Sequence, residues 1–252
     1  MLNVRGEGMD KKQTVLVTGC ASGIGRCIAE KYLQTGYKVI GIDKDECSLD
    51  GEFELYLCDL SNEKDVKDTF INIEKRTNSI SYLISCAGIL FDNTRNTIEK
   101  MDLNEWYTVL NNNLTSSMIL TREAIPFLKK STSDKAIVFV SSDQAFYPKN
   151  KSSAYATSKG GLVAFSKACA IELIQYGIRV NAVAPASVKT NFIKKMTNSV
   201  NRMEEIYQKE NWKMPLGIIE PEEVAELLFF LGTPKSRKIT GQTIMIDSGL
   251  YL

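Results

Sequence analysis

The 252-residue sequence contains no histidine. This absence excludes Ser-His-Asp and Cys-His catalysis, together with every metal site that depends on an imidazole ligand. A general acid in this chain must therefore be a Tyr, Lys, Cys, Asp or Glu. The six cysteines include no C-x-x-C pair, which argues against a zinc site. We expect no bound metal, and we interpret the cysteines as reduced thiols of a cytoplasmic protein.

Strong net charge and long apolar runs are also missing. The formal net charge is +1, which favours neither nucleic acid nor an anionic membrane surface as a partner. No apolar stretch is long enough to cross a bilayer, and the first ten residues lack the hydrophobic core of a signal peptide. We interpret residues 1–11 as a flexible extension and expect a small-molecule substrate, with no nucleic-acid or membrane partner.

The sequence does contain a regular alternation of short apolar runs and helical patterns. Runs of Val, Ile and Leu without polar alternation indicate strands that are buried on both faces. Their alternation with helices predicts one doubly wound parallel sheet of about seven strands within a single α/β domain, residues 12–252. Strands are predicted at Thr14–Thr18, Lys38–Ile42, Glu54–Cys58, Tyr82–Cys86, Ala136–Ser141, Arg179–Val183 and Thr243–Ile246, and helices at Ile24–Thr35, Glu63–Arg76, Leu103–Lys129, Ser153–Gln175 and Pro221–Leu231.

A glycine-rich turn, Thr18–Gly25, follows the first predicted strand and opens a helix. Its spacing is G-x-x-x-G-x-G rather than the general G-x-G-x-x-G, but the strand–turn–helix context suits a dinucleotide pyrophosphate. Asp43 ends the second predicted strand, 24 residues after Gly19. A carboxylate there can accept hydrogen bonds from ribose hydroxyls and would repel a 2′-phosphate, which favours NAD over NADP. The adjacent Lys44 leaves NADP open, because a cation can tolerate that phosphate.

Tyr155 and Lys159 are four residues apart, so a helix would place both on one face. A free phenol titrates near pH ~10, and an ammonium about 5 Å away could lower that pKa by about two units. Such a tyrosine could exchange a proton with a carbonyl or alcohol oxygen. An isolated Y-x-x-x-K is more often a solvated pair, but here Ser142 precedes Tyr155 by thirteen residues.

Together these motifs resemble the short-chain dehydrogenase/reductase family over roughly residues 12–249, which implies a Rossmann-like fold. The matching segments are the T-G-x-x-x-G-I-G turn, Asp59-Leu60, the W-x6-N-L element from Trp106 to Leu114, the S-x12-Y-x3-K of Ser142, Tyr155 and Lys159, the N-x-V-x-P of Asn181–Pro185, and Thr240-Gly241-Gln242. One departure is the family's N-N-A-G, which reads Ser85-Cys86-Ala87-Gly88 here.

The resemblance implies a role for each matched position. Tyr155 would be the general acid/base, with Lys159 lowering its pKa and Ser142 donating a hydrogen bond to the substrate oxygen. Asn113 would position a water, although Asn111 and Asn112 compete for that assignment. The implied coenzyme-binding residues are Gly19, Ser22, Gly23, Ile24, Gly25, Asp43, Asp59, Leu60, Ala87, Gly88, Tyr155, Lys159, Pro185, Val188 and Thr190.

The implied activity is NAD(P)(H)-dependent interconversion of a secondary alcohol and a carbonyl. One alternative is an NADPH-dependent 3-oxoacyl-carrier-protein reductase, for which Lys194, Lys195 and Lys213 could bind an acidic carrier. A non-catalytic regulator that senses dinucleotides is another. Enoyl reductases of the family place more residues between the tyrosine and the lysine. We expect residues 191–216 to form a substrate lid and the long helices to pair in a homodimer or homotetramer.

Overall fold

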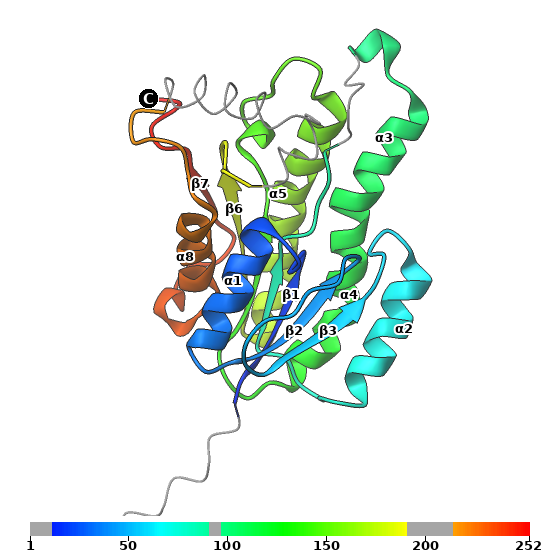
Figure 1. The fold of residues 1–252 in the computed structure, drawn as a ribbon, viewed down its shortest axis with the longest axis vertical. Helices are drawn as coiled ribbons and strands as arrows, with labels where there is room; N and C mark the ends of the chain where they lie inside the picture. The colour runs from blue at the N-terminus through cyan, green and yellow to red at the C-terminus, as the bar shows by residue number, and fades with distance from the viewer. Residues whose placement is uncertain (1–11, 91–96, 191–213) are drawn as a thin grey trace, which may run out of the picture.

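The computed structural model describes residues 12–90, 97–190 and 214–252, and within them seven strands form one sheet (Figure 1). Every neighbouring pair of strands is parallel, in the order β3-β2-β1-β4-β5-β6-β7. The predicted doubly wound α/β fold is therefore confirmed. The strands are β1 (Thr14–Thr18), β2 (Lys38–Asp43), β3 (Phe53–Leu57), β4 (Tyr82–Ser85), β5 (Lys135–Val140), β6 (Ile178–Pro185) and β7 (Thr243–Ile246).

Helices cover both faces of the sheet and bury its central strands between two apolar layers, while the edge strands β3 and β7 are only partly buried (Figure 1). On β1, Leu16 belongs to one core and its neighbours Val15 and Val17 to the other. This burial on both faces is the reason why the strands read as continuous apolar runs. The first core is completed by α2 (Glu63–Glu74), α4 (Ser116–Lys130) and α5 (Ser153–Leu173), and the second by α1 (Gly23–Gln34) and α8 (Pro221–Gly232).

The helix N-termini differ in a way that matters for the site. At α2, the Asn62 side chain accepts hydrogen bonds from the backbone N–H groups of Lys64 and Asp65. At α8, Glu220 and Glu223 form a reciprocal capping box. At α1, by contrast, Ser22 makes no side-chain capping bond within the described structure. The first N–H groups of α1 are therefore left for a ligand.

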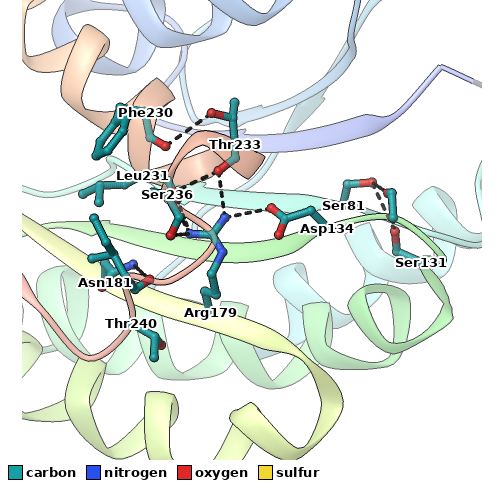
Figure 2. Close-up of polar contacts among 12 residues, drawn as sticks. Ser81, Ser131, Asp134, Arg179, Asn181, Phe230, Leu231, Thr233, Ser236 and Thr240 are labelled. Atoms are coloured by element: carbon teal, nitrogen blue, oxygen red, sulfur yellow. Dashed lines mark hydrogen bonds and ion pairs between the residues drawn. The ribbon is translucent and has the colours of Figure 1, made fainter.

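Arg179 of β6 holds the end of α8 against the sheet (Figure 2). Its guanidinium is buried and donates to the carbonyl oxygens of Leu231 at 2.8 Å and Thr233 at 3.1 Å. It also donates to Ser236 Oγ and to the Asp134 carboxylate, both at 2.8 Å. A cation at a helix C-terminus complements the helix dipole, and the fork of donors satisfies several carbonyls at once. This cluster fixes α8 relative to β5 and β6.

Several predicted boundaries change in the structure. The helix expected at Leu103–Lys129 is divided into α3 (Leu103–Leu110), a π-helical turn (Asn111–Thr115) and α4. β6 continues to Pro185, so this strand delivers its last residues directly to the site described below. The predicted extension, 1–11, and residues 191–213 of the predicted lid lie outside the described residues. Within the described ranges, the helices are too short or too polar to cross a membrane.

Candidate active site

The sheet order creates a crevice at the carboxyl end of β1. This strand pairs with β2 on one side and with β4 on the other, so the strand order reverses at β1. A cavity of about 600 Å³ opens there. It is lined by Ser142 and by every predicted coenzyme-binding residue: Gly19, Ser22, Gly23, Ile24, Gly25, Asp43, Asp59, Leu60, Ala87, Gly88, Tyr155, Lys159, Pro185, Val188 and Thr190. Asn113 lies behind this wall, fully buried.

The glycine-rich turn between β1 and α1 is closed by backbone packed on backbone. A Cβ atom at Gly25 would lie 2.0 Å from the Gly19 carbonyl oxygen, and Gly19 itself has a φ of +71°. A Cβ atom at Gly19 would lie 3.0 Å from the Ala87 nitrogen. Side chains at these two positions would clash with the neighbouring backbone and force open this turn, the cradle in front of α1. The cradle and the uncapped helix N-terminus fit the pyrophosphate of a dinucleotide.

Thr18 compensates for part of the departure at Ser85–Gly88. Its Oγ1 accepts hydrogen bonds from the backbone N–H groups of both Cys86 and Ala87, each at 3.2 Å. These bonds hold the end of β4 beside the end of β1 without the family's asparagines. Burial raises the pKa of the Cys86 thiol to about 12, so the thiol is protonated at neutral pH and is a poor nucleophile.

Asp43 joins the end of β2 to the glycine-rich turn. One carboxylate oxygen, Oδ2, accepts from the Ala21 backbone N–H at 2.9 Å, and the other accepts from that of Asp45 at 3.1 Å. The carboxylate is only partly buried and faces the cavity. Its orientation is thus set by two backbone donors before any ligand binds.

Asn113 is the buried member of the Asn111–Asn113 run and lies in the π-helical turn. Its amide accepts from the Ile89 N–H at 2.7 Å, and donates to the Ile89 carbonyl at 2.8 Å and to Ser158 Oγ at 3.1 Å. A π-helical turn adds a residue and rotates the positions that follow it. Of the neighbours of Asn113, Asn111 is exposed, and Asn112 is half-buried and lines the cavity, so the choice of Asn113 stays a prediction.

Lys159 projects from α5 to the end of β5 and is almost fully buried. Its ammonium donates to the Val140 carbonyl oxygen at 2.8 Å and lies 5.8 Å from the centre of the Tyr155 ring. Burial lowers the pKa of Lys159 to about 8. The Ser141 hydroxyl donates to the Lys159 carbonyl at 2.9 Å, which gives a second link between α5 and the segment after β5.

Burial raises the pKa of Tyr155 to about 12; a hydrogen bond with Ser142 opposes the rise, and the charge of Asp143 adds to it. The expectation that Lys159 lowers this pKa by about two units is therefore wrong for this structure. That expectation counted the attraction between the two charges but not the cost of removing a phenolate from water. The consequence is a phenol that is protonated at neutral pH and is a weaker acid than a free tyrosine.

Sequence reasoning missed the polar groups that surround Ser142. Ser142 Oγ donates to Asp143 Oδ1 at 2.8 Å and accepts from the Gln144 N–H at 3.2 Å. The Tyr251 hydroxyl, from the C-terminal end of the chain, donates to Asp143 Oδ2 at 2.7 Å. A polar pair directly after a buried strand was the available signal for Asp143 and Gln144, since ligands bind at the carboxyl ends of such strands. Nothing local in the sequence indicated Tyr251.

The buried ammonium predicts a specific pH dependence of stability. Because folding lowers the Lys159 pKa from 10.5 to about 8, the unfolded chain binds more protons between these pH values. The contribution of Lys159 to the free energy of unfolding should therefore rise with pH across this window, by up to about 3 kcal/mol. The buried and half-buried cysteine thiols, whose pKa values folding raises, contribute with the opposite sign. Urea titrations from pH 7 to 10.5 should therefore show a loss of stability with rising pH that is larger in Lys159→Met than in the wild type.

Lys167→Met is the matched control, since Lys167 is exposed on the same helix. The free energy of unfolding of Lys167→Met should depend on pH in the same way as that of the wild type. Equal pH dependence in the wild type and Lys159→Met would contradict a buried, costly ammonium.

Comparisons with known proteins place this site in a family. A family model described as enoyl-(acyl carrier protein) reductase matches residues 19–251. The 3-oxoacyl-(acyl-carrier-protein) reductase of Buchnera aphidicola is 33% identical over 249 residues, which cover 96% of this chain and 98% of the relative. The ligand-free structure of Thermoplasma acidophilum aldohexose dehydrogenase superposes with a TM-score of 0.87 at 32% identity, covering 95% of this chain and 94% of that one.

A third comparison is with 3-ketoacyl-(acyl-carrier-protein) reductase from Brucella melitensis, whose structure is complexed with NADH. It is 25% identical, with a TM-score of 0.84, and covers 95% of this chain and 98% of that one. These matches cover nearly the whole chain and therefore the sheet and both helical layers. The glycine-rich turn and the Ser142, Tyr155 and Lys159 motif lie within the matched residues. The chain belongs to the short-chain dehydrogenase/reductase family, whose enzymes use NAD or NADP, and it is an oxidoreductase acting on CH–OH or carbonyl groups.

Proposed function

We propose that this chain is an NAD(H)-dependent enzyme that interconverts a secondary alcohol and a carbonyl, with Tyr155 as general acid/base. The observation that carries the proposal is the position of Tyr155, Ser142 and Lys159 on the wall of one cavity, continuous with the glycine-rich turn at α1. The coenzyme cradle and the proton donor thus serve the same space. This arrangement suits a reaction at one carbon–oxygen bond.

Each side chain has a role that follows from its contacts. Tyr155 holds a proton at neutral pH and gives it to the carbonyl oxygen during reduction. Alcohol oxidation is the reverse step, in which the phenolate form of Tyr155 takes the proton of the alcohol. Ser142 positions the substrate oxygen next to that phenol. Lys159 holds the end of β5 and keeps a positive charge within reach of the Tyr155 ring. Asn113 supports this wall from behind through Ile89 and Ser158.

The coenzyme supplies the hydride acceptor or donor when it is bound. The backbone N–H groups at the start of α1 would bind its pyrophosphate. Asp43 would accept from the adenosine ribose hydroxyls, which favours NAD over NADP. Pro185, Val188 and Thr190 would hold the nicotinamide end, where β6 opens into the cavity. The NADH complex of the Brucella melitensis relative supports this preference.

The relatives leave the substrate open, because reductases of acyl-carrier-protein thioesters and an aldohexose dehydrogenase are similar to this chain to nearly the same degree. The 3-oxoacyl-carrier-protein reductase is therefore the second candidate. The lysines that favoured it, Lys194, Lys195 and Lys213, lie outside the described residues. A non-catalytic sensor is disfavoured, because Tyr155, Lys159, Ser142 and Asn113 are all present.

We also propose a cytoplasmic homodimer or homotetramer. The six cysteines are free, which suits a reducing compartment. Exposed apolar side chains lie on the long helices and at the end of α5: Ile171 is 77% exposed, Ile174 51% and Met118 38%. A second copy could cover these side chains by pairing helix with helix.

Light scattering at micromolar concentration should give the mass of a dimer or tetramer. Ile171→Glu should shift the mass toward the monomer, because a charge would be buried in the contact. Ile71→Glu, at a 55% exposed isoleucine on α2, is the matched control and should leave the mass unchanged. A monomeric wild type would contradict the assembly.

Tyr155→Phe should lower kcat about 10²- to 10⁴-fold, because it removes the proton that the reacting oxygen needs. Calorimetric titration should find NADH affinity within a few fold of wild type, since the ring remains. Tyr176→Phe, at a partly exposed tyrosine beyond α5, serves as the control and should keep full turnover. A Tyr155→Phe enzyme with near wild-type kcat at pH 7 would reject Tyr155 as the acid.

The coenzyme preference can be tested by titrating NAD, NADH, NADP and NADPH side by side. We expect tighter binding of NAD(H), and Asp43→Ala should reduce that preference about 10- to 100-fold, since it removes charge-assisted hydrogen bonds and a repulsive charge. Lys44→Ala should leave the ratio of NAD(H) affinity to NADP(H) affinity near the wild-type value. If the wild type prefers NADPH and Lys44→Ala abolishes this preference, Lys44 is the selector and the carrier-protein reductase becomes the first candidate.

A further inference from the structure

Two acceptor-bearing side chains lie beside Ser142 and have no part in the proton transfer described above. Asp143 and Gln144 follow Ser142 directly, at the start of a short 3₁₀ turn after β5. Both are buried, with 3% and 9% of their surface exposed, and both line the cavity. The Gln144 N–H donates a hydrogen bond to Ser142 Oγ. Asp143 and Gln144 therefore lie next to Ser142, the residue proposed to position the substrate oxygen.

The Asp143 carboxylate is fixed from two sides. Its Oδ1 accepts from Ser142 Oγ and its Oδ2 from the Tyr251 hydroxyl. Tyr251 in turn stacks on Tyr147, with ring centres 3.8 Å apart and planes at 12°. These bonds use two of the roughly four lone-pair positions of a carboxylate, so Asp143 can accept further hydrogen bonds in a preset orientation.

Gln144 supplies a second, independent observation. Its Oε1 atom is buried and has no hydrogen-bond partner among the residues that the structure describes. An unsatisfied buried acceptor costs free energy, and a ligand donor that reaches it would remove that cost. Asp143 and Gln144 both belong to the wall of the cavity that Tyr155 lines.

We propose that Asp143 and Gln144 form a subsite for substrate hydroxyl groups next to the reacting carbon, so that the substrate is a polyhydroxylated compound such as a polyol or an aldose. The proposal rests on the proposed function and names the substrate class of that same site. A hydroxyl beside the reacting carbon donates to either acceptor. A 3-oxoacyl thioester presents its carbonyl oxygen there instead, so that acceptor would face acceptor.

The charge of the site favours a hydroxyl over an ammonium as the donor. Asp143 carries the negative charge, but Lys149 lines the same cavity and brings a positive one. Gln144 contributes a neutral acceptor that gives an ammonium no ionic partner. Lys159 also lines the cavity, so a neutral donor group satisfies both side chains without adding a further positive charge beside Lys149 and Lys159.

The first test compares kcat/KM for sorbitol and glucose with that for cyclohexanol in the presence of NAD, and includes an acetoacetyl thioester with NADH or NADPH. We expect the wild type to favour a hydroxylated substrate over cyclohexanol. Asp143→Asn and Gln144→Met should each reduce this selectivity by about 10-fold or more. Gln175→Met, at an exposed glutamine after α5, is the matched control and should keep it.

The second test measures binding without turnover. Saturation-transfer NMR should detect sorbitol or glucose on the complex of Tyr155→Phe with NAD, and the added Gln144→Met substitution should weaken that binding about 10-fold or more. Binding of the hydroxylated compounds with no turnover by wild type would keep the subsite and reject the proposed function. Turnover of cyclohexanol or the thioester, with no binding of sorbitol or glucose, would overturn the subsite and keep the proposed function. The subsite would also be overturned if Asp143→Asn and Gln144→Met both kept the wild-type selectivity for hydroxylated substrates over cyclohexanol.

Discussion

The hydrogen bond from Lys159 to the Val140 carbonyl is the contact on which the site depends most. It joins the N-terminal part of α5 to the last residue of β5, and the Ser141 hydroxyl bonds back to the Lys159 carbonyl. Ser142 follows this junction on one side and Tyr155 lies one helical turn away on the other. The separation between serine and tyrosine is therefore set by the packing of a helix against a strand, which is far stiffer than a loop.

This junction places a charge where burial makes it costly. Burial lowers the Lys159 pKa to about 8 and raises that of Tyr155 to about 12, so it shifts both groups toward their neutral forms, while Lys159 stays mostly protonated at pH 7. A core of apolar side chains at the same place would cost less to fold. The protein thus keeps destabilising groups at the site where we propose proton transfer, and the two apolar cores around the sheet offset that cost.

The coenzyme half of the cavity is organised by backbone rather than by side chains. The turn before α1 has no room for a Cβ at Gly25, and Asp43 is oriented by the N–H groups of Ala21 and Asp45. The proposed substrate half is built differently, from Ser142, Asp143 and Gln144 on one short turn. A rigid backbone cradle binds one fixed coenzyme, whereas a few side chains can change the substrate without changing the fold.

Local spacing alone determined much of this protein. The alternation of apolar runs and helical patterns predicted the parallel sheet, the glycines predicted the turn before α1, and the interval between Tyr155 and Lys159 put both on one face of α5, because each signal depends on residues close in sequence. Only the tertiary structure decided the direction of the Tyr155 pKa, since burial depends on the whole fold. It also decided the bond from Tyr251 to Asp143 across 108 residues and the unsatisfied Gln144 oxygen, because such contacts arise only when distant segments pack together.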